Sequence, residues 1–220
     1  RLFGEDDTGA ITLGGYLLEA YEEAENFCQL LQQRVKGAGF FKTLLLRRLG
    51  SSIEAGRRTV VKLLGHDLEG FDDEDDTDED ADDERAPGTH HGNQPASEFK
   101  DFSDEEITSL NRCLALLRQG GNRDPKLDAL VGYLLGMRTD IERRWLDLGC
   151  ILFSQYYDTV RWVGDELAKL PEFKGIEIGL YAGSGRSGVW RDGQFQRCER
   201  ETLKSRVREG ELKILLGTDA

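Results

Sequence analysis

The sequence predicts an α/β fold in which a parallel sheet with flanking helices follows a mainly helical segment. Near Leu148 the spacing of apolar residues changes from a helical period to short continuous runs, and such runs are typical of strands buried on both faces of a parallel sheet. Two of these runs, 150–153 and 176–181, are each followed by residues with helical spacing, as in βα units, and a third covers 212–216. We therefore expect a three-layer α/β part from about residue 124 to 220.

The first part of the chain has the apolar spacing of helices. Between residues 13 and 35 apolar residues recur every three or four positions, and the stretch from Gly37 to Gly39 ends or bends that helix. The same spacing over 40–65 predicts a second helix. Together these helices make residues 1–66 a helical lead-in to the sheet.

Two further helices can be recognised by their first residues. Ser103 and Glu106 have the spacing of a capping box, in which each side chain accepts a hydrogen bond from the backbone N–H of the other. This helix is expected over 103–119. Asp124 precedes Pro125, and proline is favoured at the first position of a helix, so another helix is expected to begin there.

The net charge of −13 comes from one segment. Asp67–Glu84 holds thirteen acidic residues and no basic ones, and 42 minus 13 leaves 29 acidic against 29 basic residues elsewhere. The acidic composition therefore does not exclude a nucleic-acid partner. With its prolines and glycines, 67–101 is expected to be an acidic flexible insertion. The pair His90-His91 within it lacks a third ligand, so no metal site is expected.

A basic segment precedes the acidic one. Between Arg34 and Lys62 there are eight lysines or arginines and one acidic residue, Glu54. If this segment is a helix that faces solvent, its arginines are candidates for phosphate contacts. The alternatives are an ordinary solvated face or a face docked on the acidic run. The candidate residues are Arg47, Arg48, Arg57 and Arg58.

Two glycine motifs resemble nucleotide-binding loops but lack the context that such loops need. The stretch 37–43 has Phe41 where a phosphate-binding loop requires glycine, and it follows a helix instead of a strand. The G-x-G-x-x-G at 183–188 follows an expected strand, but helical spacing begins only near Glu199, whereas a dinucleotide site requires a helix at once. We exclude both sites and keep the 183–188 loop as a candidate contact to a phosphate backbone.

Polar residues follow the three expected strands at their carboxyl ends. In open α/β sheets ligands bind outside these ends, and small hydroxyl and glycine residues there let backbone amides approach phosphates closely. The residues at these positions are Ser154, Gln155, Gly183, Ser184 and Thr218. We expect them to form the ligand-facing edge of the sheet.

Four stretches resemble motifs of superfamily-two helicases, in the Swi/Snf-like, RapA-like branch. Residues 150–158, CILFSQYYD, resemble motif IV, and 180–184, LYAGS, resemble the strand-and-loop motif that follows it. Residues 213–220, KILLGTDA, look like the opening of motif V. Residues 44–52, LLLRRLGSS, are similar to the leucine- and arginine-rich segment near the junction of the two motor lobes.

The resemblance implies a piece of a DNA-dependent ATPase, a helicase or translocase. Residues 1–66 would be the helical lead-in between motor lobes, and 102–220 a partial second RecA-like lobe, an incomplete RecA-like parallel sheet. It implies that the strand-end residues face the backbone of double-stranded DNA. The first RecA-like lobe of the same parent protein would be a partner, and the intact parent would bind ATP and Mg²⁺.

The same resemblance implies that this chain has no catalytic residue of its own. Phosphoryl transfer requires a phosphate loop, a metal-binding acidic motif and ATP-contacting arginines placed together, and the 220 residues contain none of these motifs. We expect no bound cofactor and no ATP hydrolysis from the chain alone. Because it starts at Arg1 and stops within the stretch that looks like motif V, we expect a fragment of a longer protein.

Two further expectations concern the location of the protein and an alternative function. No apolar run approaches the roughly 18 residues of a membrane helix, and four scattered cysteines suit reduced thiols in the cytoplasm. The alternative function is a non-catalytic helical interaction module with an acidic regulatory segment. The polar strand ends favour the helicase interpretation, because a scaffold has no need of them.

Overall fold

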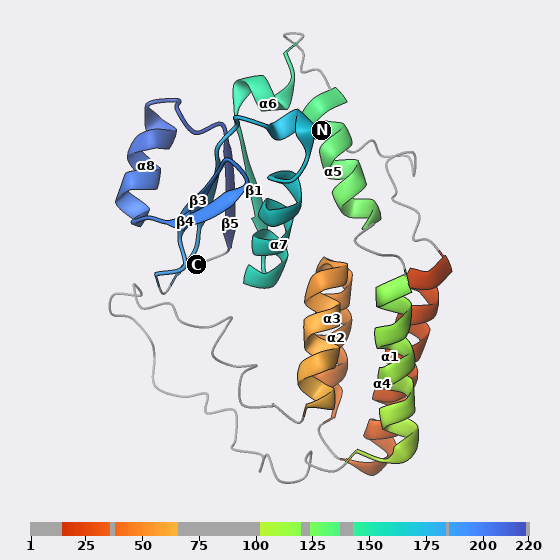
Figure 1. The fold of residues 1–220 in the computed structure, drawn as a ribbon. Coiled ribbons are helices and arrows are strands. Elements are labelled where there is room, and N and C mark those ends of the chain that lie inside the picture. Colours follow the sequence, from red (N-terminus) through yellow and green to blue (C-terminus); the bar gives the residue numbers. More distant parts are fainter. Residues whose placement is uncertain are drawn as a thin grey trace, which may run out of the picture.

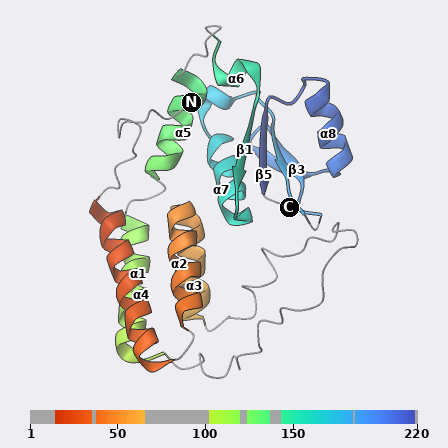
Figure 2. The ribbon, with the colours of Figure 1, turned by 180° about the vertical axis from the view of Figure 1, so that it is seen from behind.

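The computed structural model describes residues 15–35, 38–65, 102–119, 124–136, 143–183 and 185–218. These ranges form a helical part and an α/β part that lies beyond one end of the helices, as Figure 1 shows and Figure 2 shows from behind. The α/β fold preceded by a mainly helical segment is confirmed. The expected acidic insertion lies outside the described residues. None of the described helices combines the length and apolarity needed to cross a membrane.

Four helices make up the helical part. They are α1 (Gly15–Arg34), α2 (Gly39–Ser51), α3 (Ile53–Leu64) and α4 (Asp104–Gln119). α1 packs against α4, and α2 against α3. The buried residues of α1, from Leu17 to Leu31, are mostly three or four positions apart, so one stripe of the helix faces the shared core. Burying each large apolar side chain in this core stabilises the fold by roughly 1.5–3 kcal/mol.

The start of α4 confirms the predicted capping box. The Ser103 N–H donates to Glu106 Oε2 at 2.8 Å, and the Glu106 N–H donates to Ser103 Oγ at 3.2 Å. Glu106 is buried, and its carboxylate also accepts a hydrogen bond from Arg34 at 2.9 Å. It therefore ties the end of α1 to the start of α4, and these partners compensate the cost of burying its charge.

The prediction of a single helix over 40–65 is wrong, because the chain breaks at Ser52. This residue has an extended backbone, with φ −157° and ψ 159°, and its hydroxyl accepts a hydrogen bond from the Ala55 N–H at 3.1 Å. The serine side chain thus caps α3 and competes with a continued helix. After the break α3 packs along α2 so closely that a Cβ on Gly56 would lie 2.6 Å from Leu49 Cδ1.

The α/β part contains a sheet of five strands. Its elements are α5 (Pro125–Gly136), α6 (Trp145–Leu148), β1 (Cys150–Ser154), α7 (Tyr157–Leu167), a short 3-10 helix (Pro171–Phe173), β2 (Ile178–Tyr181), β3 (Gly188–Arg191), β4 (Gln194–Arg197), α8 (Arg200–Arg208) and β5 (Ile214–Thr218). The strand order is β1-β5-β2-β3-β4. β5 pairs in parallel with β1 and β2, as predicted from the apolar runs, whereas β3 pairs antiparallel with β2 and β4. The sheet is therefore mixed.

Helices cover both faces of the sheet, as the predicted three-layer arrangement requires. On one face α7 shares a core with Ile178 and Ile214, and on the other Leu203 of α8 packs with Leu212. Figure 1 shows α7 and α8 on opposite sides of the sheet. The strand order explains why both faces are covered. The connection from β1 to β2 crosses over the position that β5 occupies between them, and the connection from β4 to β5 runs in the opposite direction. Two right-handed crossovers in opposite directions must use opposite faces.

The β3–β4 hairpin was not predicted. Its two-residue turn is Asp192-Gly193, with φ values of 50° and 77°, which is the backbone of an Asp-Gly turn between short strands. The hairpin packs on α7, where Trp190 Nε1 donates a hydrogen bond to Asp165 at 2.7 Å. The Arg161 guanidinium lies 3.8 Å from the centre of the Phe195 ring. The Asp-Gly pair was the signal in the sequence.

Candidate nucleic-acid interface

The carboxyl ends of β1, β5 and β2 meet at one edge of the sheet, because these strands are parallel. Ser154 and Thr218 are register partners at the ends of β1 and β5. Gln155 follows directly, and Gly183 lies two residues beyond the end of β2. We call these residues the strand-end edge. The structure brings them to the same side of the sheet, as predicted, while Ser184 lies outside the described residues.

Ser154 is held by the protein itself. Its Oγ lies 3.2 Å from Ser51 Oγ at the end of α2, and it accepts a hydrogen bond from the Tyr156 N–H at 3.4 Å. Gln155 is exposed, and Thr218 is half-buried. Of the side chains predicted to face phosphate, Gln155 and Thr218 are therefore accessible to a ligand. Ser154 instead positions the turn between β1 and α7.

The loop after β2 is a tight turn that closes on its own strand. Ser187 Oγ donates to Ala182 O at 2.8 Å and accepts from the Ala182 N–H at 3.0 Å, while the Arg186 N–H donates to Gly183 O at 3.0 Å. This turn places the Arg186 guanidinium 4.9 Å from the centre of the Tyr157 ring at the start of α7. The loop thus carries a cation beside the strand-end edge.

Three cations lie near this edge. Arg186 belongs to the 183–188 loop that was kept as a candidate contact, whereas Arg200 and Lys204 were not predicted from sequence. The Arg200 guanidinium lies 5.1 Å from the centre of the Tyr181 ring, and Lys204 Nζ lies 5.8 Å from the same centre. A hydrogen bond to Glu201 raises the pKa of Lys204, which keeps its ammonium charged. The spacing of four between Arg200 and Lys204 was the available signal, since it puts both on one face of the expected helix.

The four arginines predicted to contact phosphate do not form one surface. Arg47 is exposed and makes no ion pair within the described ranges. Arg57 and Arg58 are partly exposed and both pair with a glutamate of their own helix. Arg48 requires a correction: only 2% of it is exposed, and it pairs with Asp158 at 3.2 Å. Its guanidinium holds α2 against α7 and does not face solvent.

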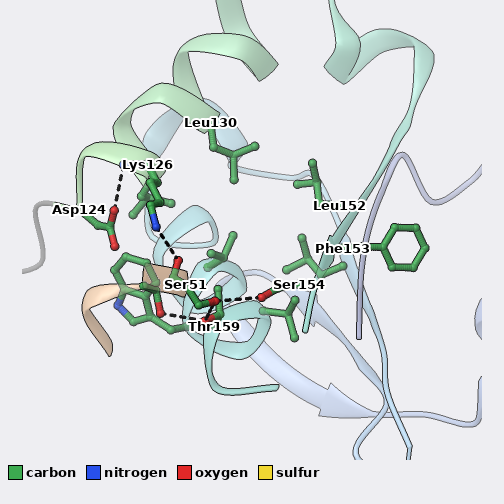
Figure 3. Close-up of a pocket in the computed structure, with 14 residues that line it drawn as sticks. Ser51, Asp124, Lys126, Leu130, Leu152, Phe153, Ser154 and Thr159 are labelled. Atoms are coloured by element: carbon green, nitrogen blue, oxygen red, sulfur yellow. Dashed lines mark hydrogen bonds between the residues drawn. The ribbon is translucent and has the colours of Figure 1, made fainter. Parts of the chain in front are cut away.

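A cluster of hydroxyl groups joins the helical part to the α/β part. Thr159 Oγ1, in the first turn of α7, lies 2.7 Å from Ser51 Oγ and 2.9 Å from Ser52 Oγ. Figure 3 shows Ser51 between Thr159 and Ser154. A cavity of about 240 Å³ opens beside the cluster, and apolar side chains of α5, β1 and α7 form most of its wall. Because the hydroxyls bond to one another, the cluster connects elements and offers no activated nucleophile.

Asp124 ties the break between α2 and α3 to the start of α5. Its Oδ1 accepts from the Lys126 N–H at 2.9 Å and its Oδ2 from the Ile53 N–H at 2.9 Å. One buried carboxylate therefore caps two helices. Lys126 Nζ lies 3.5 Å from Ser51 O. Burial lowers the pKa of this lysine, although the charge of Asp124 opposes the shift.

The described residues contain no group of three histidine, cysteine, aspartate or glutamate side chains placed to hold a metal ion. The pair His90-His91 lies outside them. The four cysteines are free thiols. Burial raises the pKa of Cys28 and of Cys113 to about 12, so these two thiols stay protonated and weakly nucleophilic at neutral pH.

Comparisons of the chain with protein-family models, with curated proteins and with solved structures found no match. The functional interpretation therefore depends on the residues and geometry described above, and the resemblance to superfamily-two helicases stays a prediction.

Proposed function

We propose that the chain forms the nucleic-acid-facing edge of the second RecA-like lobe of a DNA-dependent ATPase, in the Swi/Snf-like, RapA-like branch of superfamily-two helicases. In the intact parent protein this lobe would act with the first RecA-like lobe to move along or remodel double-stranded DNA. The observation that carries the proposal is the register of the sheet, in which Ser154 and Thr218 end neighbouring parallel strands. Ligands of open α/β sheets bind outside such ends.

The groups at the strand-end edge suit a phosphate backbone. The Gln155 amide and the Thr218 hydroxyl are hydrogen-bond donors for phosphate oxygens, and Gly183 presents its backbone without a side chain. Arg186, Arg200 and Lys204 supply positive charge beside them. Contacts of this kind position a protein on DNA without reading the bases. We expect binding with little sequence preference and a strong dependence on salt concentration.

ATP and Mg²⁺ do not fit the residues of this chain alone. The 220 residues contain no GxxxxGK[ST] loop, and the described part holds no cluster of metal-ligating side chains. Nucleotide and metal therefore belong, under this proposal, to the intact parent protein. We expect purified chain to show no ATP turnover with or without DNA, and turnover at the rate of a motor enzyme would contradict the proposal.

Binding isotherms with a fluorescently labelled DNA duplex, recorded over a salt series, test the strand-end edge. The double variant Gln155→Ala, Arg186→Ala should weaken binding about ten-fold or more, because one neutral and one charged contact are lost. The slope of log affinity against log salt should fall by about one, as one fewer counterion is released. Arg112→Ala is the matched control, since this arginine is exposed on α4 beside Glu23. Equal losses in the control and the double variant would refute the assignment.

A second candidate function is the non-catalytic helical interaction module with an acidic regulatory segment. One observation favours it: α1 to α4 enclose a core that is distinct from the core under the sheet, as an independent binding module would. A folded chain without saturable DNA binding at low salt would make this module the better interpretation.

A further inference from the structure

A cleft with a surplus of positive charge lies between α3, the last turn of α4 and the first turn of α7. Its volume is about 430 Å³. The charged residues that line it are Arg57, Arg58, Lys62, Arg118, Glu54 and Asp158. Four of these side chains are cations and two are carboxylates. None of them belongs to the strand-end edge, so the cleft is a separate feature of the surface.

Both carboxylates of the cleft are neutralised from the protein side. Glu54 pairs with Arg57 at 2.5 Å and with Arg58 at 2.8 Å. Asp158 pairs with Arg58 at 2.7 Å and, from its buried side, with Arg48 at 3.2 Å. Two carboxylates thus meet three guanidinium groups before the other cations of the cleft are considered. These five side chains therefore carry a net positive charge.

Arg118 adds a guanidinium that no described carboxylate neutralises. It is exposed in the last turn of α4, and it makes no ion pair with any residue of the described ranges. A guanidinium has five N–H donors. Arg118 therefore brings a full set of donors to the cleft, and Arg57 uses only part of its set on Glu54.

Arg58 stays charged, and the cations that line the cleft repel one another. Burial alone would lower the pKa of Arg58, but its hydrogen bonds to Glu54 and Asp158 and the charges of these carboxylates raise the pKa above its ordinary value. Like charges gathered in one hollow interact unfavourably. A bound anion relieves that repulsion, and a ligand that binds only the folded protein stabilises it.

We propose that this cleft binds a compact anion with two or more linked phosphate groups, of the pyrophosphate type. Guanidinium groups are planar forks that match pairs of phosphate oxygens. The volume of the cleft lies in the range of small-molecule sites. Its cations come from α3 and α4 and line a single cleft. Proteins that bind a nucleic-acid strand instead have an extended basic groove along the backbone of the strand. The site is independent of the DNA proposal above.

Isothermal titration calorimetry of the full chain with sodium pyrophosphate tests the site, without divalent cations and at constant ionic strength. We expect saturable one-to-one binding, and weaker binding of inorganic phosphate, which engages fewer guanidinium groups. Arg118→Ala should weaken pyrophosphate binding about ten-fold, as expected for the loss of one charge-assisted contact. Because Arg118 has no ion pair within the described ranges to lose, circular dichroism should show an unchanged fold. Arg112→Ala, on the same helix but outside the cleft, should bind like the wild type.

Three results would overturn the proposal. The first is that injection of pyrophosphate gives no more heat of binding than injection of sodium chloride at the same ionic strength. The second is an equal loss in Arg112→Ala and Arg118→Ala, which would indicate general surface charge. The third comes from the labelled duplex: if Arg118→Ala weakens DNA binding while pyrophosphate neither binds nor competes, the cleft belongs to the nucleic-acid backbone. Gln155→Ala should leave pyrophosphate affinity unchanged, so failure of the strand-end edge and failure of the cleft are distinguishable.

Discussion

The accessible side chains of the strand-end edge, Gln155 and Thr218, differ in pairing from the buried polar side chains at the junction between the helical and α/β parts. At the junction Asp124, Asp158 and Thr159 are buried, and each has two partners. At the edge Gln155 is exposed and Thr218 half-buried, and neither side chain has a hydrogen-bond partner among the described residues. Residue type alone therefore does not indicate a ligand site. Burial with complete pairing indicates a structural role, and exposure without pairing indicates availability to a ligand.

The largest effect is expected from Asp158→Ala at the junction. The variant leaves Arg48 buried without this carboxylate, and breaking a buried ion pair by removing one partner typically costs about 3–5 kcal/mol. Urea titration measures the free energy of unfolding. Asp147→Ala is the control, because Asp147 pairs with Arg144 at the surface and should cost far less. Equal losses of unfolding free energy in the two variants would show that the buried ion pair at the junction stabilises the fold no more than the exposed pair does.

A smaller loss is expected from Asp124→Ala, which removes the cap of two helices at once. One N-cap typically contributes about 1 kcal/mol, so the free energy of unfolding should fall by about 2 kcal/mol. Asp124→Asn is the matched control: its amide oxygen still accepts one of the two hydrogen bonds, so about half of the loss should be recovered. If alanine and asparagine cost the same, the two hydrogen bonds are not the source of the stability.

Glu177, just before β2, separates the effect of pairing from the effect of burial, because it is fully paired but lies near the surface. Hydrogen bonds from Arg191 and Arg206 hold its pKa below the ordinary value, against the opposing effect of partial burial. Since the folded pKa is depressed, the stabilisation is present above the unfolded pKa of about 4.3 and is lost as pH falls through the folded pKa. Glu177→Gln should cost up to about 1 kcal/mol at neutral pH and little in strong acid. A urea titration at each pH measures this, and equal losses at both would contradict the linkage.

The smallest effect on stability is expected at the strand-end edge. Gln155→Ala removes no partner within the described residues, so the free energy of unfolding should change by less than about 0.5 kcal/mol. DNA affinity of the same preparation should nevertheless fall. A loss of stability comparable to that of Asp124→Ala would place Gln155 with the structural residues of the junction and contradict the comparison.

The elements that could be predicted from sequence depend on residues close to one another along the chain. The capping box of Ser103 and Glu106 spans three positions, and Pro125 marks the start of its own helix. The apolar runs predicted the parallel strands, and the strand ends then located Gln155 and Thr218. The break at Ser52 could not be predicted in the same way. A serine is compatible with a continued helix, and the break depends on the packing of α3 on α2.

The site could be predicted less completely than the fold, because its charges depend on distant partners. The sequence does not distinguish Arg48 from an exposed arginine. Its burial depends on Asp158, which is 110 positions away along the chain. Arg186 stands beside the strand-end edge only because Ser187 folds the loop back on Ala182. Charge clusters in a sequence therefore identify candidates, and tertiary contacts decide which of them face solvent.

Asp124 closes a long loop of the chain through one of its hydrogen bonds, and this has a consequence for the entropy of loop closure. Its hydrogen bond to Ile53 joins residues 71 positions apart, and the 18 residues of Asp67–Glu84 lie between them. The entropy of closing such a loop in the unfolded chain grows only with the logarithm of its length. Removing these 18 residues would change the closure free energy by only about 0.3 kcal/mol, and doubling the loop would cost about 0.6 kcal/mol. The connection between α3 and α4 can therefore vary widely in length while the contact between Ile53 and Asp124 keeps nearly the same stability.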